Sequence, residues 1–181
     1  MNYKTMLTVL AVALAFPTVA SADDAELESA KEKFAGEFQA EADRATERER
    51  IDVAIERVVS EMSRVRRRFA RSSLEDSTTP CETFKIRFSS DVMQIHCTTN
   101  EPARTHINGP RVRWTNNEGE EFALEQKLEA NRMTQRFESE DGARINEYTL
   151  REGGDVLVKS VTITSDRLPK DLTYSRTFRR Q

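Results

Sequence analysis

The sequence predicts an α+β protein in which a long N-terminal amphipathic helix precedes an antiparallel β-meander of eight or nine strands. Residues 24–72 contain no proline and a single glycine, Gly36, and they are rich in Ala, Glu, Arg and Lys, a composition typical of helix. From residue 77 onward, apolar and polar residues alternate and turn sequences recur at short intervals, as in strands joined by hairpins. These observations divide the chain into a charged helical segment, residues 23–76, and a β-meander domain, residues 77–181.

Residues 1–22 have the pattern of a cleaved secretory signal peptide. Lys4 precedes an apolar run from Met6 to Phe16, and the small residues Ala20-Ser21-Ala22 come just before Asp23, which predicts cleavage after Ala22. The run is far shorter than the roughly 20 residues of a membrane span, and no later stretch approaches that length. We therefore expect a periplasmic or secreted protein without a transmembrane segment.

The second half of the helical segment carries a heptad-like row of apolar residues, about 20 residues long. Successive members are four or three residues apart: Ile51, Ile55, Val58, Met62, Val65 and Phe69. Two interpretations are open. The row packs along the β-rich part of the chain, which its short length favours, or it forms a coiled-coil interface for a protein partner or for self-association.

Charge excludes one class of partner and leaves one cluster to explain. Cleavage after Ala22 would remove one basic residue, Lys4, and no acidic residue. The remaining chain would have 27 basic and 31 acidic residues, a net charge of −4, which argues against a nucleic-acid partner. Five arginines and no acid lie in residues 63–71. They could contact phosphate or anionic lipid headgroups, but the acids of residues 23–62 offer internal partners. We expect a solvated, self-neutralising face.

The β-rich segment shows a two-residue period. Phe84, Ile86 and Phe88 alternate with polar residues and form a predicted hairpin with residues 92–98. Turn sequences such as Asn108-Gly109-Pro110 and Asp141-Gly142 separate the later runs, because Asn, Asp and Gly supply the positive φ of tight turns. So many consecutive strands must curl into a closed barrel or a bent half-barrel, for which the 51–69 row is a candidate cover.

Strand number and turn spacing over residues 82–180 resemble those of the lipocalin and fatty-acid-binding group of up-and-down barrels. The lipocalin Gly-x-Trp motif is missing, since the sole tryptophan, Trp114, lies in the middle of the meander. The C-terminal Arg167-Leu168-Pro169 and Tyr174–Arg179 are similar to the end of small secreted bacterial β-proteins. The resemblance implies a lipocalin-like barrel or half-barrel and brings no catalytic or binding residue with it.

The two cysteines, Cys81 and Cys97, predict a disulfide in an exported chain. They bracket the first predicted hairpin, but strict alternation puts them on opposite faces in some registers. The bridge then requires Cys81 to lie before the strand, in the Thr79-Pro80 lead-in. No metal site is expected, because His96 and Cys97 point to opposite faces of a strand and His106 lies apart from them.

Polar residues fall in the inward register of the meander. Gln126, Gln135 and Arg176 each lie between apolar inward residues, where a cavity would let them orient a ligand's carboxylate or phosphate. The apolar wall of this predicted site is Trp114, Phe122, Met133, Tyr174 and Phe178. The alternative, given more weight, is that Arg176 is solvated at a mouth or edge or pairs with an acid of the helix.

The leading functional hypothesis is a non-enzymatic exported protein that binds a small apolar or amphipathic molecule on the concave face of the meander. The rival is an interaction or structural module that works through its N-terminal helix. No cofactor is expected, and neither a Gly-x-Ser-x-Gly sequence nor a local serine or acid partner for a histidine indicates an enzyme.

Overall fold

The computed structural model describes residues 22–181, so the predicted signal peptide lies outside the described residues except for Ala22. The N-terminal part is not one long helix, which corrects the prediction. It comprises α1 (Ala22–Phe34), β1 (Gly36–Ala40), α2 (Arg44–Val59) and α3 (Arg64–Ser77). None of the described helices is long and apolar enough to cross a membrane.

Two local features divide the helical segment. Gly36 has φ 150°, a backbone conformation that residues with a side chain rarely adopt, so glycine favours the turn out of α1 at this position. β1 then pairs with both β2 (Thr83–Ser89) and β10 (Leu172–Arg180), and these tertiary hydrogen bonds outweigh its helix-favouring surroundings. Asp43 begins α2 by accepting a hydrogen bond from the Thr46 amide at 2.9 Å.

The sheet has ten antiparallel strands, rather than the predicted eight or nine. After β1 come β2 (Thr83–Ser89), β3 (Val92–Cys97), β4 (Ala103–His106), β5 (Val112–Thr115), β6 (Glu121–Glu129), β7 (Arg132–Ser139), β8 (Gly142–Arg151), a 3-10 turn (Glu152–Gly154), β9 (Val156–Thr164) and β10 (Leu172–Arg180). The strand order is β4-β3-β2-β1-β10-β9-β8-β7-β6-β5. The additional strands are β1 and the short β4.

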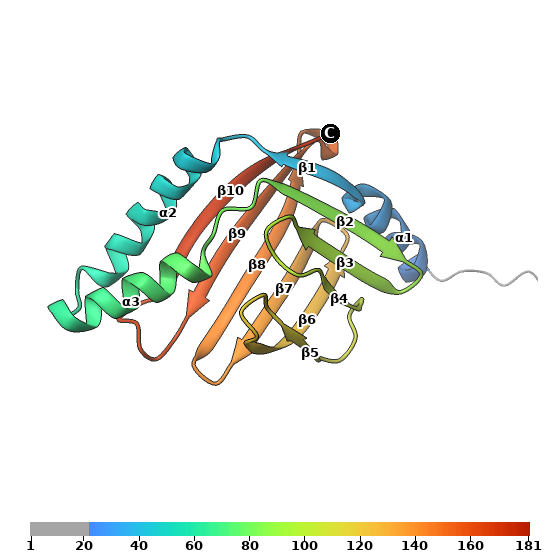
Figure 1. Cartoon of the computed structure of the whole chain (residues 1–181). Helices are drawn as coiled ribbons and strands as arrows, with labels where there is room; N and C mark the ends of the chain where they lie inside the picture. Colours follow the sequence, from blue (N-terminus) through green and yellow to red (C-terminus); the bar gives the residue numbers. More distant parts are fainter. Residues whose placement is uncertain (1–21) are drawn as a thin grey trace, which may run out of the picture.

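The sheet curls into a nearly closed barrel whose edge strands, β4 and β5, do not pair with each other (Figure 1). Side chains from the β4 side bridge this gap to β6. Thr105 Oγ1 donates to Gln126 Oε1 at 3.0 Å, and Asn108 Oδ1 accepts from the Leu128 amide at 3.1 Å. These hydrogen bonds satisfy part of the strand edges that an open sheet would expose.

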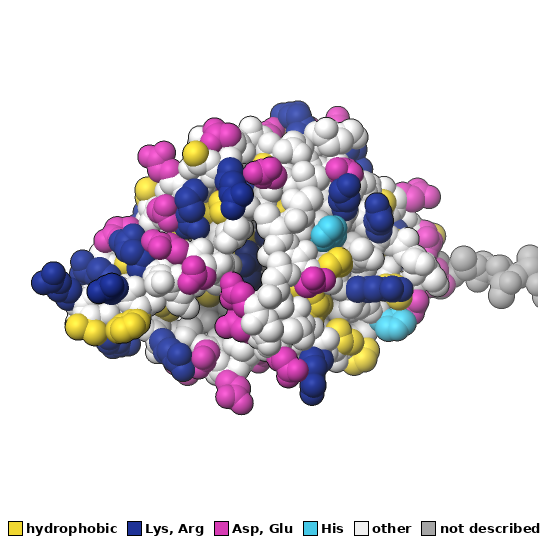
Figure 2. Space-filling model, in the orientation of Figure 1, with side chains coloured by type: hydrophobic (Ala, Val, Ile, Leu, Met, Phe, Trp, Pro, Cys, Tyr) yellow, Lys and Arg dark blue, Asp and Glu magenta, His cyan; other side chains and the backbone are white. Residues whose placement is uncertain are grey.

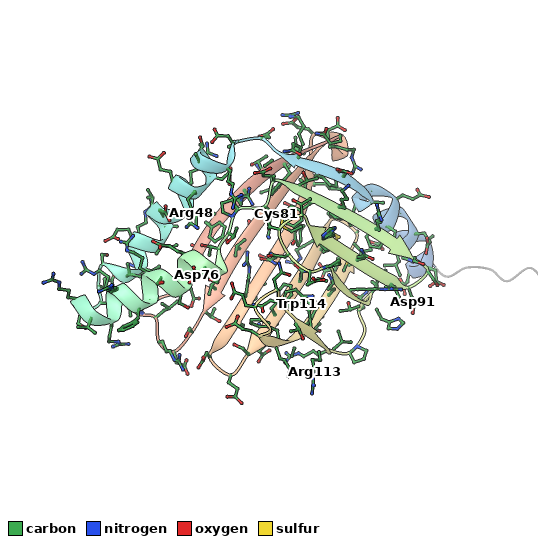
Figure 3. The ribbon with its side chains drawn as sticks, viewed as in Figure 1. Arg48, Asp76, Cys81, Asp91, Arg113 and Trp114 are labelled. Carbon is green, nitrogen blue, oxygen red and sulfur yellow. A yellow bond between two sulfur atoms is a disulfide. The ribbon has the colours of Figure 1, made fainter. Side chains whose placement is uncertain are left out.

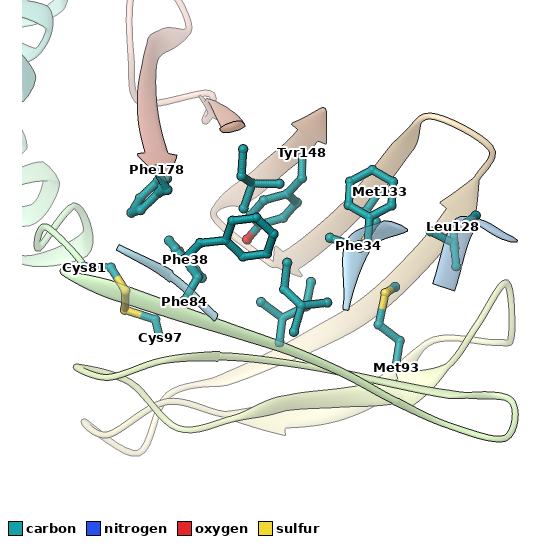
Figure 4. Packing of buried hydrophobic residues seen from close by; sticks show 14 residues of the cluster. Phe34, Phe38, Cys81, Phe84, Met93, Cys97, Leu128, Met133, Tyr148 and Phe178 are labelled. Atoms are coloured by element: carbon teal, nitrogen blue, oxygen red, sulfur yellow. A yellow bond between two sulfur atoms is a disulfide. The ribbon is translucent and has the colours of Figure 1, made fainter. Parts of the chain in front are cut away.

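Helix α1 covers one end of the barrel (Figure 1). Its Phe34 is fully buried, and the Lys31 amine donates to the Ser90 carbonyl in the β2–β3 turn at 2.8 Å. Arg180 of β10 donates to the carbonyls of Lys33 and Ala35 at the end of this helix. Phe34 joins the main core with aromatic and sulfur-containing residues of the inner face, including Met133 (Figure 4).

Helices α2 and α3 lie at the other end. Ile51, Ile55 and Val58 of α2 pack in one cluster with Leu172 of β10, so this part of the apolar row covers the sheet. The helix is interrupted between α2 and α3 at residues 60–63. The buried apolar row does not continue into α3, where Val65 and Phe69 are 69% and 73% exposed. The predicted continuous 51–69 seam is therefore wrong beyond Met62, and the coiled-coil hypothesis loses its basis.

Helix α3 is loosely attached, since Leu74 is its only buried residue. Arg66 donates to the Arg167 carbonyl at 3.2 Å, and Arg144 of β8 donates to the Ser77 carbonyl at 2.5 Å. In the arginine cluster, Arg71 pairs with acids of α2 and α3, whereas Arg66 and Arg67 donate to backbone carbonyls, so the expected self-neutralisation is seen at Arg71. Figure 2 shows the basic and apolar side chains that gather at the outer end of this helix pair.

The structure contains the predicted Cys81–Cys97 disulfide. Cys81 precedes β2, which begins at Thr83, so it lies in the lead-in outside the regular strand, whereas Cys97 is the last residue of β3 and pairs with Phe84. Both sulfurs belong to the main core (Figure 4). The bridge ties the α3–β2 connection to the barrel.

Removing this disulfide by the double substitution Cys81→Ala and Cys97→Ala should lower the free energy of unfolding. The loop closed by the bridge spans 16 residues, for which restriction of the unfolded chain corresponds to about 3 kcal/mol. Urea titration with fluorescence detection measures this value. Reduced wild-type protein should show a similar loss, and equal stability of the oxidised wild type and the double variant would contradict the prediction.

Candidate ligand-binding site

Strand register brings a set of polar side chains together on the inner face of the barrel. In one row, Leu128, Met133, Tyr148, Lys159 and Arg176 are cross-strand neighbours from β6 to β10. The adjacent row contains Gln126, Gln135, Asn146, Val161 and Tyr174. A core built only for stability rarely buries so many polar groups, because each needs a partner.

Arg176 lies at the centre of the charged part of this face. Its Nε donates to Glu47 Oε2 at 2.6 Å, and its Nη2 donates to the Cys81 carbonyl at 2.7 Å. The Arg176 and Glu47 side chains are only 5% and 2% exposed, so this is a buried ion pair. Arg176 thus pairs with an acid of the helical segment, which is the alternative that the sequence left open.

Lys159 is the cross-strand neighbour of Arg176 and has no ion-pair partner among the described residues. Its amine lies 4.7 Å from the ring centre of Phe84 and 5.6 Å from that of Tyr148. Burial, and then the positive charges of Arg144 and Arg176, hold the pKa of Lys159 well below its usual value. The inner face therefore places a buried lysine amine without a carboxylate partner among the described residues beside the buried Arg176–Glu47 ion pair.

The neighbouring amides form a second polar cluster. Gln135 Oε1 accepts from Asn146 Nδ2 at 2.9 Å and from the Tyr148 hydroxyl at 3.1 Å. Burial raises the pKa of Tyr148, which keeps this hydroxyl protonated as a donor. Gln126 is fully buried, and its Nε2 has no hydrogen-bond partner within residues 22–181. A buried donor without a partner is costly, so it is a position where a ligand acceptor would be stabilising.

Aromatic side chains flank the mouth of the barrel on the β5–β6 side. Trp114 lies 5.9 Å from Phe122 and 4.9 Å from Phe137, measured between ring centres. All three are half-buried. On the β8–β10 side, Arg144 donates to the Tyr174 hydroxyl at 3.3 Å and reaches the end of α3. The half-buried part of the inner face is therefore aromatic near β5 and carries a basic residue near the end of α3.

An open cleft of about 650 Å³ lies between the start of α2 and the end of α3. Figure 3 labels Arg48 and Asp76, which line it from these two helices. Its other lining residues are Arg44, Ala45, Asp52, Glu75, Thr79 and Pro80. Two of its lining residues, Arg48 and Pro80, are the sequence neighbours of Glu47 and Cys81. Glu47 and Cys81 are the two residues to which Arg176 donates hydrogen bonds, so the cleft lies close to the buried ion pair.

The inner face includes every residue of the predicted site. Gln126, Gln135, Met133, Arg176 and Phe178 are buried, Trp114 and Phe122 are half-buried near edge strand β5, and Tyr174 is half-buried against the α2 cluster. Ligand binding by these residues stays a prediction. Sequence reasoning missed Lys159, Asn146, Tyr148, Arg144, Thr105 and Glu47. Lys159 was detectable, because it lies between the inward Leu157 and Val161, whereas no local pattern indicates that Glu47 enters the barrel.

No protein-family model matches the chain, and no curated protein matches it. Solved structures do. A fatty acid binding protein of Schistosoma mansoni in complex with arachidonic acid is 15% identical, with a TM-score of 0.52, over 84% of this chain and 98% of that chain. Fatty-acid-binding protein 1 of Echinococcus granulosus is 14% identical, with a TM-score of 0.52, over 82% and 98%.

A secretory abundant heat-soluble protein of Ramazzottius varieornatus is 14% identical, with a TM-score of 0.54, over 82% of this chain and 96% of that chain. At such identities the likeness concerns the fold alone. This fold is a nearly closed antiparallel β-barrel of the fatty-acid-binding type, with lipocalin-like architecture. A shared fold does not transfer a function, as the different descriptions of these three proteins illustrate.

Proposed function

We propose that this protein is a non-enzymatic carrier that binds a small amphipathic molecule inside its β-barrel. The observation that carries the proposal comes from the two polar rows on the inner face, where, within residues 22–181, Lys159 has no carboxylate partner and Gln126 Nε2 has no acceptor. Both groups would gain a partner from a ligand's polar head, while the apolar inner face would hold its hydrocarbon chain. The N-terminal 22 residues support export to the periplasm or the medium.

The fold comparison adds a ligand class. Two of the similar structures are described as fatty-acid-binding proteins, and one of them holds arachidonic acid. A fatty acid has the chemistry that this inner face would accept, since its carboxylate suits the basic pair Arg176 and Lys159. We therefore propose a fatty acid or a similar single-chain amphiphile as the ligand.

Binding should be detectable with two probes of equal chain length, dodecanoate and dodecanol. Trp114, the sole tryptophan, lies at the mouth with Phe122 and Phe137, so its fluorescence should change when either probe enters. Native mass spectrometry of protein purified without detergent should show one bound molecule on a monomer. A protein that binds neither probe, with unchanged Trp114 emission, would contradict the proposed function.

The rival function, protein recognition through a helix, retains one supporting observation, the exposed Val65 and Phe69 on α3. The same mass spectrometry experiment separates the two. A bare dimer or a co-purified protein that is lost in the variant with Val65→Ser and Phe69→Ser would favour the rival.

A further inference from the structure

We propose that Glu47 is a built-in counterion that occupies the anion site of the barrel, and that a ligand with an acidic head group binds by displacing it and releasing the first turn of α2. This inference rests on the proposed carrier function. It adds an ion pair that must open before an acidic ligand binds, and we call this ion pair the latch. The latch consists of Glu47 and Arg176.

The two partners of the latch belong to different parts of the fold. Arg176 is in the middle of β10, whereas Glu47 is in the first turn of α2 and enters the barrel from outside the sheet. The Arg176 guanidinium is held by the Cys81 carbonyl and stacks 4.8 Å from the Phe178 ring centre. Arg176 is thus positioned independently of Glu47, and it would stay in place when the carboxylate leaves.

The first turn of α2 has room to move. The cleft of about 650 Å³ borders it through Arg44, Ala45 and Arg48. The apolar contacts that hold α2 to the barrel begin at Ile51 and continue toward its C-terminal end. A shift of the first turn toward the cleft would leave these apolar contacts in place and would have to break only the long hydrogen bonds that Arg48 donates to Glu75 and Thr78, at 3.3–3.4 Å.

Exchange of the Glu47 carboxylate for a ligand carboxylate would keep the Arg176 charge paired. Displacing Glu47 without a substitute would leave Arg176 buried and unpaired, which is strongly unfavourable. A ligand carboxylate restores the same charge-assisted hydrogen bonds. The displaced Glu47 would regain water and keep its existing neighbour Arg50, which is exposed and lies 3.3 Å away. A neutral head group cannot replace Glu47 in this way, so it should leave the latch closed.

Glu47→Gln tests the latch, because it removes the competing charge while keeping the shape of the side chain. We expect this variant to bind dodecanoate about tenfold more tightly, equivalent to about 1.4 kcal/mol, with the affinity for dodecanol unchanged. Isothermal titration calorimetry measures both. Glu49→Gln is the matched control, since Glu49 is an exposed residue of the same helix and the change in net charge is the same.

A second measurement uses the wild-type protein, so it does not depend on the folding of a variant. Dodecanoate should speed hydrogen exchange of the amides of residues 47–51, and dodecanol should not. Equal dodecanoate affinity in wild type and Glu47→Gln, or slower exchange at these amides with dodecanoate, would overturn the latch. In that case continued binding of dodecanol would leave the carrier function standing, whereas binding of neither probe would end both proposals.

Discussion

Arg176→Leu should lower the free energy of unfolding by about 3–5 kcal/mol, because it leaves the Glu47 carboxylate buried without its cation. Arg176 joins α2 to β10, so this substitution tests the stability of the fold as well as ligand uptake. Equilibrium unfolding in urea measures the loss.

Replacing both partners distinguishes the cost of an unpaired charge from the value of the pair. The double variant with Glu47→Leu and Arg176→Leu should recover most of the lost stability, since an apolar pair of similar volume often substitutes for a buried ion pair without cost. Arg179→Leu is the control, because Arg179 is an exposed residue of the same strand whose ion pairs face solvent. A double variant as unstable as Arg176→Leu would show that the ion pair itself stabilises the fold.

Phe34→Ala should lower the free energy of unfolding by a similar amount, about 3–5 kcal/mol, as expected for removing a fully buried aromatic ring. Phe34 is the side chain by which α1 closes its end of the barrel, beside Met133 and Leu128 (Figure 4). The substitution should also speed hydrogen exchange throughout α1, because Ala30 is the helix's only other buried apolar residue.

Phe69→Ala provides the comparison for this experiment. Phe69 is the same residue type in another helix and is largely exposed, so its removal should change stability by no more than about 0.5 kcal/mol. If Phe34→Ala changed stability as little as Phe69→Ala, α1 would not be part of the folded core. The conclusion that α1 closes one end of the barrel would then be wrong.

Local patterns of the sequence determined most of the barrel. Alternation of apolar and polar residues predicts strands such as β2, with Phe84 and Ile86 inward, because side chains of a strand point to opposite faces in turn. The same alternation identifies Gln126, Gln135 and Arg176 as inward polar residues. The cysteine pair predicts the disulfide, and the position of Cys81 before β2 is the one required in registers that put the two cysteines on opposite faces.

Only the tertiary structure decided the features that depend on distant partners. β1 has a helix-favouring composition around it and becomes a strand because β2 and β10 both offer it hydrogen bonds. The apolar row that begins at Ile51 ends at Met62, because the chain turns at residues 60–63 and α3 leaves Val65 and Phe69 in solvent. Composition and spacing report only on neighbours along the chain.

The charged centre of the candidate site illustrates the same limit. The sequence marked Arg176 as inward and left open whether a ligand or a helix acid would pair with it. The selection of Glu47 among the acids of the helical segment depends on how α2 packs on β10, and 129 residues separate the two partners. Inward direction is a local property of a strand and was predictable, whereas the partner of a buried charge is set by packing, which only the folded chain defines.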